Sequence, residues 1–170
     1  YWGSTIEIEA VVHPLGNREK GTIHFNDTAG SMARDSVTNA SSVVRMITGK
    51  NLSDYDVHVN VVGGGNIDGP SAGAAITCAI ISALTGKPLR QDIAVTGEIS
   101  LSGRIKPVGG IAEKAFGAHQ GGMKAILIPK QNAPDMGSEY MHMKVITVDT
   151  IQDILEHMLV RKKQKMKGSK

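Results

Sequence analysis

Alternation of hydrophobic and polar residues predicts several strands along the chain. In residues 5–12, Ile6 and Ile8 alternate with Glu7 and Glu9, which is the period of two expected of a strand with one buried face. Further short apolar segments bounded by turn residues also favour strands. We expect them at residues 22–25, 57–61, 93–95, 99–105 (with a turn at Ser102-Gly103), 125–128 and 145–148.

A period of three to four residues replaces this alternation in the segments that we predict to be helices. Residues 31–48 carry one apolar face, with Ser31 as a plausible N-cap. Residues 70–85 are apolar or small on every side, which is typical of a central, buried helix. Residues 111–119 form a shorter helix, and Thr150 caps a last amphipathic helix.

Length and composition are those of a single globular domain. The 170 residues include one cysteine, which excludes an intramolecular disulfide framework and favours a reducing, cytoplasmic setting. No apolar run is long enough to span a bilayer, and no basic-then-apolar leader marks a signal peptide. No metal is expected, because the six histidines lack the spacing of a metal site.

Positive charge is concentrated at the C-terminus. The net charge is +3, and residues 161–170 contribute six Lys and Arg residues but no acidic ones. Removing those six charges leaves residues 1–160 with a net charge of −3. We therefore expect one folded domain at residues 1–160 and a basic, frayed tail at residues 161–170, without a nucleic-acid site on the domain.

Ser71 is a candidate nucleophile. It lies in the stretch Asp68-Gly69-Pro70-Ser71-Ala72-Gly73, at the predicted start of the buried helix. Pro70 suits the first helical position, so Ser71 falls in the first turn, beside unpaired backbone N–H groups that stabilise an oxyanion. The commoner role of a serine at a helix start is to cap that helix.

Lys114 is a charge inside an apolar helical stripe. Ile111, Ala115 and Ala118 form the stripe, and Lys114 lies on the same face. Lysine avoids burial unless it is paired or functional, and desolvation lowers its pKa until the neutral amine is a usable general base. The alternative is a side chain that extends to solvent at the rim of the helix. The sequence cannot show whether Lys114 meets Ser71.

Four motifs, in order and spacing, resemble the proteolytic domain of Lon proteases over almost the whole chain. They are the stretch around Ser71, then Thr96-Gly97-Glu98-Ile99, then Pro107-Val108-Gly109-Gly110 with Glu113-Lys114, and Ala125-Ile126-Leu127-Ile128-Pro129. The opening stretch, through Asn26-Asp27-Thr28-Ala29-Gly30, is more similar to the bacterial B-type branch. The resemblance implies a two-layer α/β (α+β) fold, shared with ribosomal protein S5 domain 2.

The resemblance also implies roles for individual residues. Ser71 matches the family's nucleophile, Lys114 its base, and Thr96 a threonine that hydrogen-bonds the lysine. Asp68 would cap the helix or pair with Lys114 in an inactive form. The family often has two histidines on the strand before the serine, but only His58 remains here. Four residues would flank the substrate strand, because glycine lets a peptide backbone approach closely: Gly63, Gly64, Gly65 and Asn66.

Partners are likewise implied by the resemblance. Lon proteases are ATP-dependent, and we expect polypeptide substrates, a homo-hexameric ring and an AAA+ ATPase module. The chain has no phosphate-binding loop of the Gly-x-x-x-x-Gly-Lys-Ser/Thr type. ATP and Mg²⁺ are therefore expected only through a separate module, with the chain being either a domain of a longer protein or a stand-alone relative.

Other functions fit parts of the pattern. Gly69-Pro70-Ser71-Ala72-Gly73 matches the Gly-x-Ser-x-Gly elbow, with Asp135 and His142 as conceivable triad partners. A glycine-rich loop before a helix also suits a phosphate-binding, kinase-like domain of the same fold. A third alternative is a non-catalytic Lon-like assembly domain, although such domains lack the serine–lysine pair.

Overall fold

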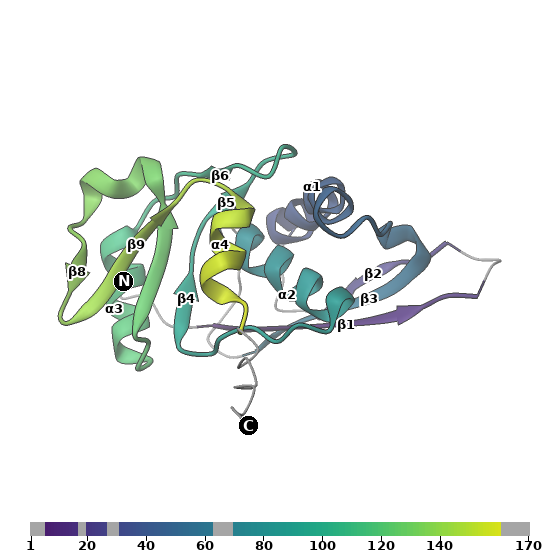
Figure 1. Ribbon diagram of the computed structural model, residues 1–170, viewed down its shortest axis with the longest axis horizontal. Helices are drawn as coiled ribbons and strands as arrows, with labels where there is room; N and C mark the ends of the chain where they lie inside the picture. The colour runs from purple at the N-terminus through teal and green to yellow at the C-terminus, as the bar shows by residue number, and fades with distance from the viewer. Residues whose placement is uncertain (1–5, 17–19, 27–30, 63–69, 161–170) are drawn as a thin grey trace, which may run out of the picture.

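The computed structural model describes residues 6–16, 20–26, 31–62 and 70–160. Two sheets lie side by side along the molecule, each covered by helices (Figure 1). A short two-stranded hairpin adjoins them. The mixed α/β character expected from the sequence is confirmed, whereas the likeness to ribosomal protein S5 domain 2 stays a prediction.

The first sheet has the strand order β1-β3-β2. Strand β1 (Glu7–Pro14) is antiparallel to β3 (Tyr55–Val62), which is parallel to β2 (Ile23–Phe25). Helix α2 (Gly73–Thr85) packs against β1, and α1 (Ser31–Thr48) packs against α2. Along β1 exposed and half-buried residues alternate from Glu7 to Val12 as predicted, so one face of this sheet is left to solvent.

The second sheet has the order β4-β7-β9-β8. Strands β4 (Ile93–Val95), β7 (Ala125–Pro129) and β9 (Met143–Val148) are parallel, and β8 (Glu139–Tyr140) is antiparallel at one edge. Strand β4 is the other edge. A continuous apolar strand such as β7 is typical of a sheet that is buried on both faces.

Helices cover both faces of the second sheet. Helix α3 (Ile111–Gln120) packs with Ile126 and Ile128, and α4 (Ile151–Met158) lies in the cluster that contains Leu127. The alternation along β7 separates these clusters, since successive side chains point to opposite faces. Helices α2 and α1 therefore lie over one face of the first sheet, whereas helices cover both faces of the second sheet, so the expected two-layer arrangement does not describe the second half of the molecule.

Short elements complete the chain. The segment at 99–105, predicted to be extended with a turn at Ser102-Gly103, is a hairpin of β5 (Glu98–Ile99) and β6 (Ile105–Lys106), so the turn is confirmed. Gly103, with a φ of 84°, turns the hairpin. Three 3₁₀ helices are described: η1 (Leu52–Asp54), η2 (Pro70–Ala72) and η3 (Lys130–Asp135). Of these, η2 lies within the segment predicted as the buried helix, whereas η1, η3 and the strand β8 had no counterpart in the predictions.

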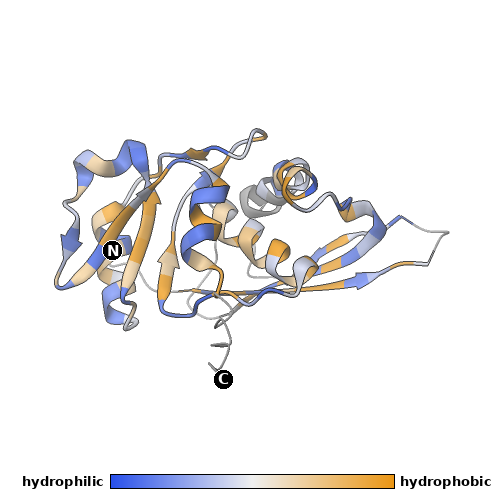
Figure 2. Cartoon of the chain, viewed as in Figure 1, coloured by the Kyte–Doolittle hydropathy of each residue, from blue (hydrophilic) through white to orange (hydrophobic). Residues whose placement is uncertain are grey.

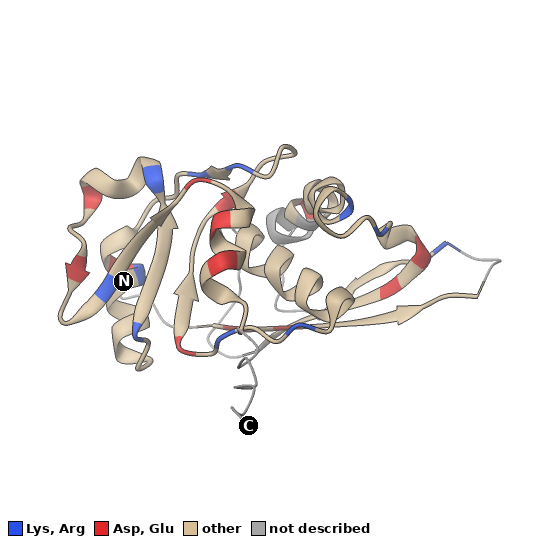
Figure 3. Cartoon of the chain, viewed as in Figure 1, with Lys and Arg blue, Asp and Glu red and all other residues tan. Residues whose placement is uncertain are grey.

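Hydropathy follows this architecture. Apolar residues are concentrated on the strands and on the faces of the helices turned towards them, and polar residues lie outside (Figure 2). Charged residues lie at the ends of elements and on the outer side of α4 (Figure 3). Within the described ranges no helix combines the length and apolarity needed to cross a membrane.

Candidate functional site

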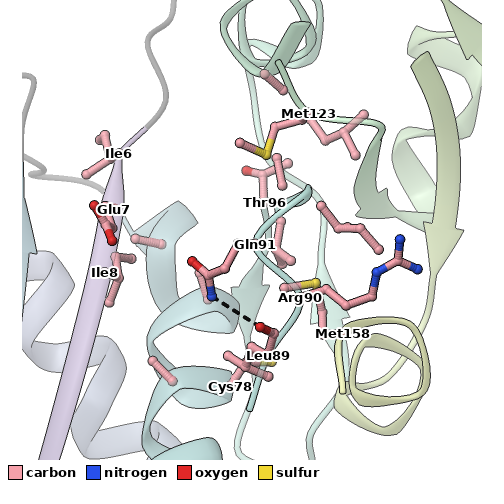
Figure 4. A pocket seen from close by; sticks show the side chains of 18 of the residues that line it. Ile6, Glu7, Ile8, Cys78, Leu89, Arg90, Gln91, Thr96, Met123 and Met158 are labelled. Carbon is pink, nitrogen blue, oxygen red and sulfur yellow. Dashed lines mark hydrogen bonds between the residues drawn. The ribbon is translucent and has the colours of Figure 1, made fainter. Parts of the chain in front are cut away.

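A pocket of about 680 Å³ lies between β1, α2, β4 and α3. Ile6, just before β1, and Ile8 in β1 lie on one side of it, and Thr96 and Leu89 lie on another (Figure 4). Most of its described wall is apolar. The polar and charged residues that line it are Glu7, Ser71, Arg90, Gln91, Thr96 and Lys114. The pocket therefore brings Ser71, Thr96 and Lys114 to one surface, although they come from η2, the connection after β4, and α3.

Ser71 lies in η2, which continues directly into α2. The N-cap position of α2 is held by Ala72 and not by Ser71, so the structure does not support helix capping as the reason for this serine. Its side chain is half-buried. A half-buried hydroxyl in the wall of a pocket is accessible to a substrate.

Two backbone hydrogen bonds attach the start of α2 to the connection between β4 and β5. The Gly97 N–H donates to the Ser71 carbonyl (3.0 Å), and the Ala74 N–H donates to the Gly97 carbonyl (3.1 Å). A Cβ atom at Gly97 would lie 2.5 Å from Cγ2 of Ile105, so only glycine fits this close approach. The contact fixes Ser71 beside Thr96, which directly precedes Gly97.

The amine of Lys114 is hydrogen-bonded to the backbone just before its own helix, α3. Its Nζ donates to the Gly109 carbonyl at 2.9 Å, and Gly110, with a φ of 69°, is the N-cap of α3. The neighbours in the predicted stripe are buried: Ile111 (3% exposed), Ala115 (0%) and Ala118 (3%). Lys114 itself is half-buried. The stripe is thus confirmed, with a lysine at its edge.

Burial lowers the pKa of Lys114 below its ordinary value, while the nearby Glu113 carboxylate acts in the opposite direction. No ion pair of Lys114 occurs among the described residues. A lowered pKa is expected of a desolvated amine, because a low-dielectric environment disfavours its charged form. A larger fraction of the Lys114 amine is therefore neutral near neutral pH than in an ordinary lysine.

Thr96 is buried (6% exposed), and its N–H donates to the Leu127 carbonyl at 3.1 Å. Its side chain lines the pocket together with Lys114. In the described part of the chain, the acceptor of Lys114 Nζ is Gly109 rather than Thr96, and no hydrogen bond joins Lys114 to Ser71. The structure thus gathers the three predicted residues without linking their side chains.

Several predicted residues lie elsewhere. Asp68, Gly63, Gly64, Gly65 and Asn66 lie outside the described residues, so their roles stay predictions. His58 is exposed on the first sheet, with its ring stacked on His24 at a centroid distance of 4.7 Å. It is not among the pocket residues.

The alternative triad partners also lie away from the pocket. Asp135 accepts a hydrogen bond from Asn132 (2.7 Å), and His142 pairs with Glu139 (3.5 Å). Neither lines the pocket that contains Ser71, which counts against a Ser–His–Asp arrangement. In the described ranges no group of three or more His, Cys, Asp or Glu side chains is arranged to hold a metal ion.

Sequence reasoning missed two parts of this region. The wall formed by Leu89, Met123 and Met158 joins segments far apart in the chain, and no local pattern signals such an association. It also missed Asn132, a buried polar residue (5% exposed) that binds the backbone next to Gly109. The sequence signal that could have indicated Asn132 is its position shortly after the apolar segment that forms β7.

Comparison with known proteins places the chain in a family. Residues 1–161 match the sequence profile of the C-terminal proteolytic domain of Lon proteases. The archaeal Lon protease of Pyrococcus abyssi is 35% identical over 96% of this chain, which corresponds to 17% of that protein. Lon protease 2 of Bacillus subtilis is 38% identical over 93% of the chain and 31% of its own length.

A third relative, the Lon protease of Haemophilus influenzae, is 40% identical over 89% of this chain and 19% of its own length. The chain thus spans less than a third of each of these relatives. Archaeal and bacterial proteins match with similar identity, so the B-type branch stays a prediction. The matched residues include Ser71, Thr96 and Lys114, and the chain belongs to the family of Lon protease C-terminal proteolytic domains.

Proposed function

We propose that this domain is a serine endopeptidase in which Lys114 activates Ser71. The observation that carries the proposal is the shared pocket, where a half-buried lysine with a lowered pKa lies on the same surface as the helix-start serine. A serine hydroxyl needs a base to become a nucleophile, and a desolvated lysine amine is such a base. The family of proteolytic domains supports this assignment.

The reaction proceeds through an acyl-enzyme. The neutral Nζ of Lys114 takes the proton of Ser71 Oγ while Oγ attacks the carbonyl carbon of the scissile peptide bond. The resulting ammonium returns the proton to the leaving amine, and the C–N bond breaks. A water molecule, deprotonated in turn by Lys114, then attacks the acyl carbon. The ester bond to Oγ breaks, and the Lys114 ammonium returns the proton to Ser71 Oγ.

The helix start stabilises the oxyanion. Backbone N–H groups there point at developing negative charge and need no reorganisation. The Ala74 N–H is bonded to the Gly97 carbonyl, so the oxyanion uses N–H groups that precede Ala74. The Gly109 carbonyl orients the amine, because a neutral amine that donates one N–H to Gly109 keeps its lone pair for the serine proton.

The substrate is an extended polypeptide. Strands β1 and β4 are each at the edge of a sheet and both contribute to the pocket wall. An extended peptide adds to such an edge through main-chain hydrogen bonds. The segment containing Gly63, Gly64, Gly65 and Asn66 would flank the same peptide, with Thr96 and Asp68 supporting the lysine and the helix start.

The proposal also includes an additional module and an oligomeric state. Relatives named Lon protease are three to six times as long as the matched segment, which is consistent with an additional AAA+ ATPase module that would supply ATP and Mg²⁺ chemistry. The domain itself would need no cofactor. We further propose a homo-hexameric ring in the cytoplasm, and membership of the B-type branch.

The decisive experiment compares wild type with Ser71→Ala and Lys114→Ala, in the longest natural form of the protein. We expect each variant to lose about 10³-fold or more in cleavage of an unfolded protein and a peptide panel. In wild type, kcat/KM should fall as pH drops through a limb below the ordinary lysine pKa of about 10.4, because Lys114 must be neutral. A peptide boronate should modify Ser71.

Full activity in both variants would refute the proposed mechanism. Inactive wild type that still forms a ring would favour the assembly-domain alternative. Phosphate-dependent stabilisation without cleavage would favour the kinase-like one.

A further inference from the structure

Asn132 is a buried polar residue to which the proposed reaction assigns no part. It lies in η3 and is 5% exposed. Its Oδ1 accepts from the Val108 N–H (2.9 Å), and its Nδ2 donates both to the Val108 carbonyl (2.8 Å) and to Asp135 Oδ2 (2.7 Å). Buried amides need such partners, since an unpaired polar group in the interior is costly.

Two of these bonds hold both backbone polar groups of Val108. The amide of Asn132 binds the N–H and the carbonyl of Val108 as a neighbouring strand would. Asp135 fixes the orientation of the amide, because a carboxylate accepts only from the NH₂ group and so leaves Oδ1 facing Val108. The position and direction of the peptide at Val108 are thereby set by η3.

The next residue carries the acceptor of the lysine. Gly109 directly follows Val108, and its carbonyl accepts from Lys114 Nζ at 2.9 Å. A Cβ atom at Gly109 would find no atom within 4 Å, and Gly110 has a φ of 69°. Two consecutive glycines allow many backbone conformations. The direction of the Gly109 carbonyl therefore depends on the anchor that precedes it.

We propose that Asn132 is a positioning residue that holds the Lys114 amine in the pocket through Val108 and the Gly109 carbonyl. This rests on the proposed function of Lys114. Without the bonds to Val108, the Gly109 carbonyl turns away and the amine extends into solvent. The amine then recovers the ordinary pKa of a hydrated lysine, and the fraction that is neutral at a given pH falls.

Asn132→Ala tests the proposal, with Asn26→Ala as a matched control. Asn26 binds Val61 by the same pair of bonds, donating from Nδ2 to the carbonyl (2.8 Å) and accepting the N–H on Oδ1 (3.0 Å), but on strand β3. Both variants remove a side-chain amide that binds the N–H and the carbonyl of a single backbone residue. Only Asn132→Ala releases the segment that carries Gly109.

The measurement is kcat and KM for one peptide against pH, together with the melting temperature. For Asn132→Ala we expect kcat at neutral pH to fall about tenfold or more, with KM nearly unchanged. Its acid limb should move to higher pH by at least half a unit. Asn26→Ala should show a lowered melting temperature with the acid limb at the wild-type position.

An acid limb that stays in place in folded Asn132→Ala, or that moves equally in Asn26→Ala, would overturn the proposal. If Asn132→Ala does not fold, Asp135→Asn takes its place. It weakens the orientation of the amide and should give a smaller shift in the same direction, and no shift would again overturn the proposal. Failure of the proposed function is distinguishable, because it would appear as full activity in Ser71→Ala.

Discussion

Lys114 and Ser71 contribute differently to the pocket. Ser71 is placed by its carbonyl, which accepts from the Gly97 N–H, and any small residue at this position would keep this bond. Lys114 instead brings an amine to an apolar helix face, where burial lowers its pKa. A group whose charged form is disfavoured in the folded state reduces stability at pH values where the unfolded chain would protonate it. The lysine is thus retained at some cost to folding.

Lys114→Met should therefore separate stability from activity. Methionine has a similar length and suits the apolar stripe of Ile111 and Ala115, without a charge to desolvate. We expect the melting temperature at pH 7 to equal or exceed that of wild type, and peptide cleavage to fall about 10³-fold. The stability gain should shrink as pH rises towards the ordinary lysine pKa, because the unfolded lysine then also becomes neutral.

Lys124→Met provides the comparison, since Lys124 is an exposed lysine that pairs with Asp92 at 3.9 Å. It should leave cleavage unchanged. A melting temperature markedly lower for Lys114→Met than for Lys124→Met would contradict the view that the buried amine is destabilising.

Among the elements, α4 shows how local signals determine a helix. The side chain of Thr150 accepts from the Asp153 N–H, and the Asp153 carboxylate accepts from the Thr150 N–H, forming a capping box. Hydrogen bonds, first of all from the Asp149 N–H, lower the pKa of Asp153 against a smaller opposing effect of burial. The buried face of α4 then packs against the second sheet through Ile151, Ile154 and Leu155.

Thr150→Ala should destabilise the fold by about 1 kcal/mol, as loss of an N-cap usually does. For a domain of this size the melting temperature should fall by about 3 °C. Because the carboxylate pKa of Asp153 is lowered by folding, its contribution is present above the ordinary aspartate pKa and is lost as pH falls through the lowered value.

Thermal unfolding of Thr150→Ala and Asp153→Asn at pH 7 and pH 3 measures both effects. The difference between wild type and Asp153→Asn should be smaller at pH 3. Thr150→Ser, which keeps the hydroxyl, should match wild type at pH 7, and a loss equal to that of Thr150→Ala would show that the cap is not the cause.

On the scale of the whole molecule, the pocket depends on how the two sheets meet. Its wall combines Ile8 from the first sheet, Ile93 from the second, and Ala75 and Ala79 from α2. Helix α2 has small side chains on this side, which leaves space that a larger side chain would fill. The size of the pocket is therefore a property of the packing between the two halves.

Ala75→Leu should fill part of the pocket. We expect kcat/KM for peptides to fall about tenfold, with a melting temperature close to that of wild type, because the added side chain enters open space rather than the packed core. Ala83→Leu is the control. It lies on the same helix, is similarly half-buried, and is not a pocket residue, so it should leave cleavage unchanged.

Much of the fold was predictable because its signals are local. The alternation in β1, the apolar segment that forms β7 and the cap at Thr150 each act within a few residues. The turn at Ser102-Gly103 was predictable for the same reason, whereas η3 and β8 were less predictable, since they are short and depend on contacts with other elements. The number of layers likewise depends on which helix covers which face of the second sheet.

The candidate site divides in the same way. By itself the sequence determined the helix start at Ser71, the apolar stripe that contains Lys114 and the order of motifs that marks the family. Only the tertiary structure decided that Ser71, Thr96 and Lys114 share a pocket, and that Asn132 holds the backbone next to the acceptor of the lysine. Helix and strand signals arise from neighbouring residues, whereas a pocket and the desolvation of an amine arise from segments that meet only after the chain has folded.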